Sequence, residues 1–153
     1  MRSLGLDIGD RRIGVAISDP LGVLATPLRV FERLDDAAAI LTILQIAAQY
    51  QVWIIIVGLP QLMDGSIGLQ AEKVKTFTAK LREQSPVPVE FRDERLTTAE
   101  AQRLLQAARP DRSLRKKKVY YDGAAAAVIL QAYLNEIRPL EYPPEGGGDT
   151  PQE

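Results

Sequence analysis

The segment LGLDIGDRRIGVAISD, residues 4–19, decides the fold that this sequence predicts. Apolar residues alternate with others over residues 4–8, a polar break follows at residues 9–12, and the alternation resumes over residues 13–17. A period of two on both sides of a short polar turn is typical of a β-hairpin. We therefore expect two short strands joined by a tight turn.

Asp7 stands inside the first of these apolar strands, where a carboxylate has no packing role. Burying an unpaired charge costs on the order of several kcal/mol, so we expect Asp7 to have a partner. One candidate is a cation, for which Gly9 and Gly14 would leave room. The alternative is a set of backbone hydrogen bonds from the turn at Gly9, which Asp often accepts.

The composition predicts one globular domain. The chain has 153 residues, of which 46% are hydrophobic and 25% charged, enough for a substantial core. We assign residues 1–138 to the domain and residues 139–153, which contain four prolines and three consecutive glycines, to a flexible tail. With 19 basic and 20 acidic residues the net charge is −1, so binding of nucleic acid would require a local basic patch.

The sequence contains no cysteine and no histidine. Thiol catalysis, disulfides, zinc sites built from these residues and imidazole acid–base chemistry are therefore excluded. Any hydrolysis must use carboxylates, lysines, hydroxyl groups or metals that prefer oxygen ligands. The chain also shows no signal segment and no apolar run long enough to span a membrane, so we expect a cytoplasmic protein without a membrane partner.

Further strands and helices follow the hairpin. Residues 21–31 contain Pro27 and predict an edge strand, after which Asp35 or Asp36 should cap a helix. Residues 52–57 form an unbroken β-branched and aromatic run, which is typical of a central strand covered on both faces. That strand ends at Gly58-Leu59-Pro60, an edge where ligands collect in open α/β sheets.

The next helix carries Val74 and Phe77 on its apolar side. Asp64 or Ser66 could be its N-cap, or the helix start could bind a phosphate. Residues 87–91 predict a second edge strand because of Pro88. Beyond it, a capping box predicts another helix start at Thr97.

Residues 109–118 are strongly basic and precede two tyrosines. Such a run can be a solvated loop, or it can be a strip that binds phosphates, with the tyrosines as stacking surfaces for nucleic acid. The last helix is expected to open at Asp122 and to end at Pro139. Its consecutive alanines should let it approach the sheet and bring Asp122 near Asp7, although Asp122 could also serve only as an N-cap.

Three acidic positions stand out by their surroundings: Asp7 in a strand, Asp93 or Glu94 after a strand, and Asp122 at a helix start. Together they are typical of a carboxylate site for Mg²⁺ or Mn²⁺, where metal ions assist the cleavage of a phosphodiester. That chemistry needs no histidine.

Four segments also carry a resemblance: LGLDIGDRRIGVAISD, IIIVGLPQLMDGSIG, DERLTTAEA and YYDGAAAAVIL. In this order they are similar to the signatures of the YqgF/RuvX family, described as Holliday-junction resolvases and as pre-16S rRNA nucleases. The resemblance covers the chain to about Pro139. It implies a ribonuclease H-like α/β fold, with a five-stranded mixed sheet ordered 3-2-1-4-5 and helices on both faces.

The resemblance further implies that Asp7, Glu94 and Asp122 are the catalytic residues and the ligands of Mg²⁺ or Mn²⁺, with Asp93 as an alternate. Many ribonuclease H-like nucleases carry an acidic residue at the end of the fourth strand, whereas this chain has Gly58-Leu59-Pro60 there. The third ligand would then come from the fifth strand, and Asp64 is a more distant candidate.

The function expected from these observations is metal-dependent hydrolysis of nucleic acid, with the 5′ end of pre-16S rRNA as the favoured substrate and branched DNA as the alternative. A non-catalytic RNA-binding assembly factor and an actin-like ATPase are further alternatives. RNA is favoured because no apolar seam predicts the dimer that a two-fold junction would require, so we expect a monomer or a weak homodimer. The residues expected to contact nucleic acid are Arg11, Arg12, Arg95, Arg112, Arg115, Lys116, Lys117, Lys118 and Tyr121.

Overall fold

The predicted hairpin is present at the start of the chain. Strands β1 (Ser3–Ile8) and β2 (Arg12–Ser18) pair antiparallel, with Asp7 opposite Gly14. The Gly9 backbone N–H closes the turn by donating to the Arg12 carbonyl at 2.9 Å. Gly9 is required there because a Cβ atom would lie 2.6 Å from that carbonyl oxygen. The apolar alternation and the glycine turn therefore form the structure that they predicted.

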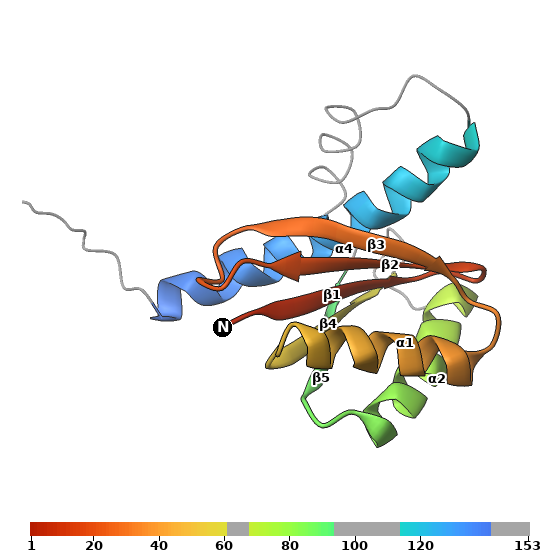
Figure 1. Cartoon of the computed structure of the whole chain (residues 1–153), viewed down its shortest axis with the longest axis horizontal. Helices are drawn as coiled ribbons and strands as arrows, with labels where there is room; N and C mark the ends of the chain where they lie inside the picture. Colours follow the sequence, from red (N-terminus) through yellow and green to blue (C-terminus); the bar gives the residue numbers. More distant parts are fainter. Residues whose placement is uncertain (61–67, 94–113, 142–153) are drawn as a thin grey trace, which may run out of the picture.

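Figure 1 shows the whole chain as a computed structural model. Backbone is described for three ranges, and side chains for most of each. The described backbone covers residues 1–60, 68–93 and 114–141, and the described side chains cover residues 1–60, 68–92 and 123–137. Within these ranges, no helix combines the length and the apolar character needed to cross a bilayer.

Five strands form one mixed sheet in the order β3-β2-β1-β4-β5, as predicted. Strand β3 (Ala25–Glu32) is antiparallel to β2, whereas β4 (Ile54–Leu59) and β5 (Val89–Asp93) run parallel to β1. The prolines occupy the edges, because Pro27 lies in β3 and Pro88 immediately precedes β5. An edge strand tolerates a residue that cannot donate a backbone hydrogen bond.

Helices cover both faces of the sheet (Figure 1). Helices α1 (Asp36–Gln49) and α2 (Leu69–Gln84) pack on one face, and α4 (Leu114–Glu141) packs on the other. Strand β4 contributes to both cores, since Ile55 and Val57 join the first and Ile54 and Ile56 join the second. The uninterrupted apolar run of β4 is therefore explained by burial on two sides.

The helix starts agree with the sequence prediction at α1 and differ at α2. Asp35 caps α1 by accepting a 2.8 Å hydrogen bond from the Ala38 backbone N–H. Helix α2 instead begins after Gly68, whose backbone is extended and which offers no side-chain cap. The prediction that Asp64 or Ser66 caps α2 was therefore wrong. Both residues lie outside the described ranges, as does the helix start predicted at Thr97.

Helix α4 is longer at both ends than the sequence predicted. It begins at Leu114, so Asp122 lies inside the helix and is not its N-cap, and the basic residues up to Lys118 are helical. Lys and Arg are good helix formers, which explains why the basic run extends the helix. The helix also continues past Pro139 to Glu141, two residues beyond the predicted end, which is within the usual variation of a helix end. The first residues of the predicted 139–153 tail are thus helical, and residues 142–153 lie outside the described ranges.

Small residues bring α4 against the centre of the sheet, as the alanine run predicted. Ala124 and Ala126 are buried. A Cβ atom on Gly5 would lie 2.8 Å from Leu130 Cβ and 3.0 Å from the Ala126 carbonyl oxygen. Neither atom can rotate away, because one is the carbonyl oxygen of the helix and the other is bonded directly to its backbone. The spacing between α4 and β1 therefore depends on the absence of a side chain at Gly5.

The same glycine-to-alanine change should have opposite effects at two positions. Gly5→Ala should lower the free energy of unfolding by about 1–3 kcal/mol, because it forces α4 away from β1. Gly123→Ala should raise it by about 0.5–1 kcal/mol, because a Cβ atom there makes ordinary 3.5 Å contacts with Pro27 and Val30 and alanine favours the helix. Urea denaturation of both variants measures the two changes. Equal effects would contradict this account of how α4 packs on β1.

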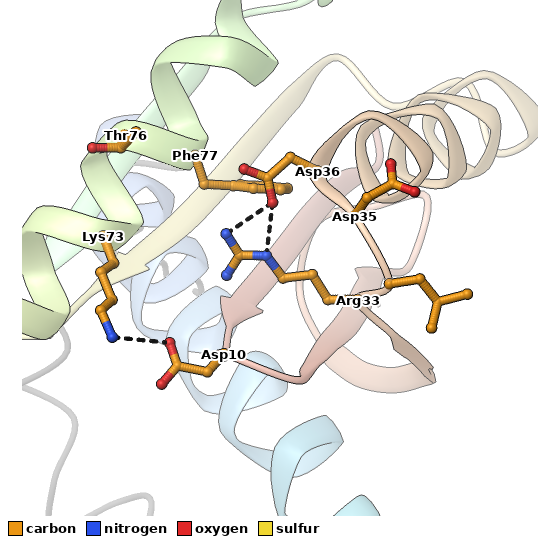
Figure 2. A pocket seen from close by; sticks show the side chains of 8 residues that line it. Asp10, Arg33, Asp35, Asp36, Lys73, Thr76 and Phe77 are labelled. Carbon is orange, nitrogen blue, oxygen red and sulfur yellow. Dashed lines mark hydrogen bonds and ion pairs between the residues drawn. The ribbon is translucent and has the colours of Figure 1, made fainter.

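A partly buried ion-pair network joins α1 and α2 to Arg33, the residue after β3, and Figure 2 shows its Arg33–Asp36 pair. The Arg33 guanidinium contacts Asp36 Oδ1 through Nε and Nη2, both at 3.0 Å, and lies 4.8 Å above the Phe77 ring. Lys80 Nζ donates to Asp36 Oδ2 at 3.0 Å. Burial by itself raises the pKa of Asp36, but the hydrogen bonds from Lys80 and Arg33 outweigh it, so the pKa lies below its ordinary value.

This network should stabilise the fold only while Asp36 is ionised. Because the pKa is lower in the folded chain than in the unfolded one, the stabilisation is present above about pH 4 and is lost as the pH falls through the folded pKa. We expect Asp36→Asn to lower the free energy of unfolding by about 1 kcal/mol at pH 7. The difference from the parent protein should shrink below about pH 4 when denaturation is followed across pH. A difference that stays constant down to about pH 2 would contradict the assignment.

Candidate functional site

Asp7 lies on the face of the sheet that α4 covers. Leu4, Leu6 and Ile8 point to the core beneath α1 and α2, and the alternation along β1 places Gly5 and Asp7 on the opposite face. Asp7 is the one residue of β1 that is only partly buried. The chain thus holds a carboxylate at the carboxyl end of a central strand, where it remains accessible.

Both positions beside Asp7 in the sheet are glycines. Gly14 faces it on β2. On the other side Leu6 pairs with Val57, so Gly58 is the next position along β4. Neither neighbouring strand therefore places a side chain next to the carboxylate. The sequence analysis identified Gly14 in this role, whereas Gly58 emerges only from the strand register.

The backbone of α4 brings Asp122 towards the same part of the sheet. Asp122 lies one helical turn, about 6 Å, before Ala126, and Ala126 lies over Gly5. Asp7 lies two residues beyond Gly5, about 6.7 Å along the strand. The next residue of the helix, Gly123, is near Val30, which belongs to the same row of the sheet as Gly14 and Asp7.

The third predicted ligand comes from the end of β5. Asp93 is the last residue of β5 and pairs with Leu59. Since β1, β4 and β5 are parallel, their carboxyl ends meet at one edge of the sheet, with β5 two strand spacings, about 10 Å, from β1. The side chain of Asp93 and all of Glu94 lie outside the described ranges.

The predicted carboxylate site is thus supported by the backbone but not tested by its side chains. Among the described residues no group of three acidic side chains could hold a metal ion. Of the three predicted ligands only Asp7 has a described side chain. The joint role of Asp7, Glu94 and Asp122 therefore stays a prediction.

The residues predicted to bind nucleic acid fall into three groups. Arg11 is exposed at the tip of the β1–β2 turn, and Arg12 is half-buried at the start of β2. Arg95 and Arg112 lie outside the described ranges. The backbone of the remaining residues, 115–118 and 121, belongs to the first turns of α4, which extend away from the sheet (Figure 1).

The sequence analysis missed a pocket beside the β1–β2 turn, of about 400 Å³ (Figure 2). Lys73 Nζ and Asp10 Oδ1 lie 3.8 Å apart, and both residues line the pocket together with Arg33. Arg33 Nη1 also donates to the Gly9 carbonyl at 2.9 Å, which anchors the turn that follows Asp7. The available signal was the cluster of charges at residues 33–36, of which only the helix cap was recognised.

Arg92 is a second residue that the sequence analysis missed. Arg92 pairs with Gly58, the β4 position beside Asp7. It is therefore the β5 member of the line of cross-strand neighbours that contains Asp7. Its guanidinium donates to Glu136 of α4 at 2.9 Å and lies 5.0 Å from the Tyr133 ring. Arg92 therefore fastens β5 to α4 on the face that carries Asp7. A charged residue inside an edge strand was the only signal for it.

A family model and individual sequence relatives both match this chain over most of its length. The family model described as "RuvX: Holliday junction resolvase" matches residues 1–136. A protein of Desulforudis audaxviator named "Putative pre-16S rRNA nuclease" is 50% identical over 135 residues, which are 88% of this chain and 94% of the relative. A protein of Moorella thermoacetica with the same name is 44% identical over 137 residues, which are 90% of this chain and 96% of the relative.

Solved structures support the fold. Thermus thermophilus RuvC in complex with a Holliday junction has a TM-score of 0.57 at 13% identity, covering 90% of this chain and 96% of RuvC. The Fowlpox virus resolvase bound to junction DNA has a TM-score of 0.55 at 14% identity, covering 90% of this chain and 99% of the resolvase. These likenesses confirm the predicted ribonuclease H-like architecture. The family match over residues 1–136 and the relatives that are 44–50% identical show that this chain belongs to the RuvX family.

Proposed function

We propose that this chain is a nuclease that hydrolyses phosphodiester bonds and that it processes the 5′ end of precursor 16S rRNA. The relatives that are 44–50% identical carry the name of such a nuclease. The reaction suits a chain without histidine or cysteine, because carboxylates and a divalent cation can perform it. As ribosomal RNA is processed where ribosomes assemble, we place the activity in the cytoplasm.

The observation that carries this proposal is the position of Asp7. It is a partly buried carboxylate at the carboxyl end of the central strand, and the positions on both sides of it are glycines. A phosphodiester approaching this edge would meet the carboxylate without obstruction from neighbouring strands.

Asp7, Glu94 and Asp122 would hold Mg²⁺ or Mn²⁺, with Asp93 as the alternate to Glu94. The fit rests on donor chemistry, since these cations prefer oxygen ligands and all the candidate donors are carboxylates. When bound, the cation would supply charge stabilisation for the phosphoryl oxygens and a more acidic attacking water. Asp7 is held in place by β1, whose neighbours on both sides are paired strands, so its position is fixed by the fold.

Removing the charge of Asp7 should abolish both metal binding and cleavage. We expect Asp7→Asn to reduce cleavage at least about 100-fold, since even residues that only orient metal ligands contribute roughly 10- to 100-fold. Calorimetric titration with Mn²⁺ should show weaker binding by the same variant, and its thermal unfolding should remain cooperative. Asp10→Asn, three residues away on the exposed turn, is the matched control and should retain activity.

Two labelled substrates distinguish the candidate functions. A precursor 16S rRNA segment and a synthetic four-way junction are incubated with Mg²⁺ or Mn²⁺, with and without EDTA. The proposal expects cleavage of the RNA and its loss with EDTA. Cleavage of the junction alone would favour the resolvase activity in the family description. RNA binding that persists in EDTA, without any product in either metal, would instead indicate an assembly factor.

The basic first turns of α4 should bind phosphates of the RNA. Replacing Lys116 and Lys117 by alanine should reduce the magnitude of the salt dependence of RNA binding, by about 0.7 in the log–log slope for each phosphate that the variant no longer neutralises. The double variant Lys73→Ala/Lys75→Ala removes the same charge from α2, on the other face of the sheet, and serves as the control. Binding measured by fluorescence anisotropy across salt concentrations gives both slopes. Equal slopes for the two double variants would contradict the role of α4.

A further inference from the structure

Strand β5 is held to the two faces of the sheet by different kinds of contact. Val89 is buried in the core beneath α1 and α2, and Phe91 packs against that core. The alternation along the strand places Glu90 and Arg92 on the opposite face, under α4. Among the described residues, the apolar core under α4 draws on β2, β3 and β4 but on no residue of β5. The attachment of β5 to α4 therefore depends on polar side chains.

Arg92 provides that attachment. Its Nε donates to Glu136 Oε1 at 2.9 Å, and its guanidinium lies 5.0 Å from the centre of the Tyr133 ring, which is buried on α4. Its Nη1 donates to the Phe91 carbonyl at 2.8 Å and to Glu90 Oε1 at 3.3 Å. A planar guanidinium can stack on a ring and bond two carboxylates at once, which the ammonium group of lysine cannot do. The side chain of Arg92 is therefore held between β5 and α4.

The segment that follows Arg92 carries candidate ligands of the proposed site. Arg92 is followed directly by Asp93, the last residue of β5, and then by Glu94 in the sequence. In the described sheet β5 is an edge strand, which pairs with β4 on one side. The helix that Arg92 contacts also carries Asp122. A displacement of β5 relative to α4 would thus separate the segments that carry these carboxylates.

We propose that Arg92 is a positioning residue of the nuclease site: it holds the end of β5 against α4 and so fixes the carboxylate that follows it relative to Asp122. That carboxylate is Glu94, with Asp93 as the alternate. The role rests on the proposed function, because that function assigns these ligands. Glu136 lies about four helical turns, roughly 21 Å, beyond Asp122. Arg92 is thus directed away from the carboxylates and acts on them through the backbones of β5 and α4.

The exposure of this ion pair distinguishes a positioning role from a contribution to stability. The side chain of Glu136 is 57% exposed and that of Arg92 is 28% exposed. Ion pairs with this much contact with water contribute little to the stability of a whole domain. A metal site is more sensitive, since loss of a group that orients its ligands lowers metal affinity or activity roughly 10- to 100-fold. We therefore expect the loss of Arg92 to alter the site far more than the fold.

Arg82 offers a matched control, because it fastens the same strand to the opposite face. Its Nε donates to the Val89 carbonyl at 2.9 Å, and its guanidinium lies 5.0 Å from the centre of the Phe91 ring. Arg82 therefore makes the same two kinds of contact as Arg92, a hydrogen bond through Nε and a ring contact. It joins the start of β5 to α2, whereas Arg92 joins the end of β5 to α4.

The substitution Arg92→Met keeps the aliphatic length and removes the hydrogen bonds. It should weaken Mn²⁺ binding roughly tenfold or more and lower kcat for a precursor 16S rRNA segment about 10- to 100-fold, with KM for the RNA unchanged. Arg82→Met should match the parent in all three quantities. Calorimetric titration and steady-state kinetics measure them, and urea denaturation confirms that each variant is folded. Parent-like Mn²⁺ affinity in Arg92→Met, or equal losses in the two variants, would overturn the proposal.

Exchanging the two charges provides a second test. Arg92→Glu places a carboxylate beside Glu90 and Glu136, and Glu136→Arg places a second guanidinium beside Arg92, so each single variant should bind Mn²⁺ more weakly than the parent. The double variant restores an ion pair between β5 and α4 in the reverse orientation. It should therefore recover most of the Mn²⁺ affinity and of kcat. A double variant no better than the weaker single variant would contradict a positioning role.

The parent protein in the same assays separates this role from the proposed function. A parent that binds no Mn²⁺ and cleaves no RNA would refute the proposed function, and the role of Arg92 with it. A parent that does both, together with an Arg92→Met variant that does both equally well, would refute only the role of Arg92.

Discussion

The close approach of α4 to strand β1 at Gly5 is the constraint on which the rest of this structure depends. With no side chain at Gly5, the backbone of the helix passes directly over the centre of the sheet, against Ala126 and Leu130. That packing sets the distance between α4 and the face of the sheet that carries Asp7. It also fixes how far Asp122, one turn earlier in the helix, lies from the sheet.

The two faces of the sheet serve different purposes because different helices cover them. The α4 face contains an accessible carboxylate with glycines on either side, and Arg92 fastens its far edge to the helix through Glu136. The opposite face contains the larger core and the ion pairs around Asp36, which hold β3, α1 and α2 together. The face under α4 thus keeps a partly buried carboxylate, whereas the opposite face is filled by the larger core.

Much of the fold could be predicted from the sequence because its signals are local. Alternation around Gly9 predicted the hairpin, and the unbroken run from Val52 predicted a strand buried on both faces. The pair Asp35-Asp36 predicted the start of α1, and the structure shows that Asp35 is the cap. The helix ends were less predictable. Gly68 rather than a polar side chain precedes α2, and α4 begins at Leu114, because lysines and arginines extend a helix as readily as they form a loop.

The sequence by itself determined the chemistry that this protein can use, since a chain without histidine or cysteine must rely on carboxylates, and it identified Asp7 as the carboxylate in an unfavourable place. Only the tertiary structure decided which residues surround Asp7. The pairing of β1 with β4 places Gly58 beside Asp7. Arg33, which follows β3, donates a hydrogen bond to Gly9 in the turn after Asp7. Such contacts join residues far apart in the chain, and their register follows from packing rather than from any local pattern.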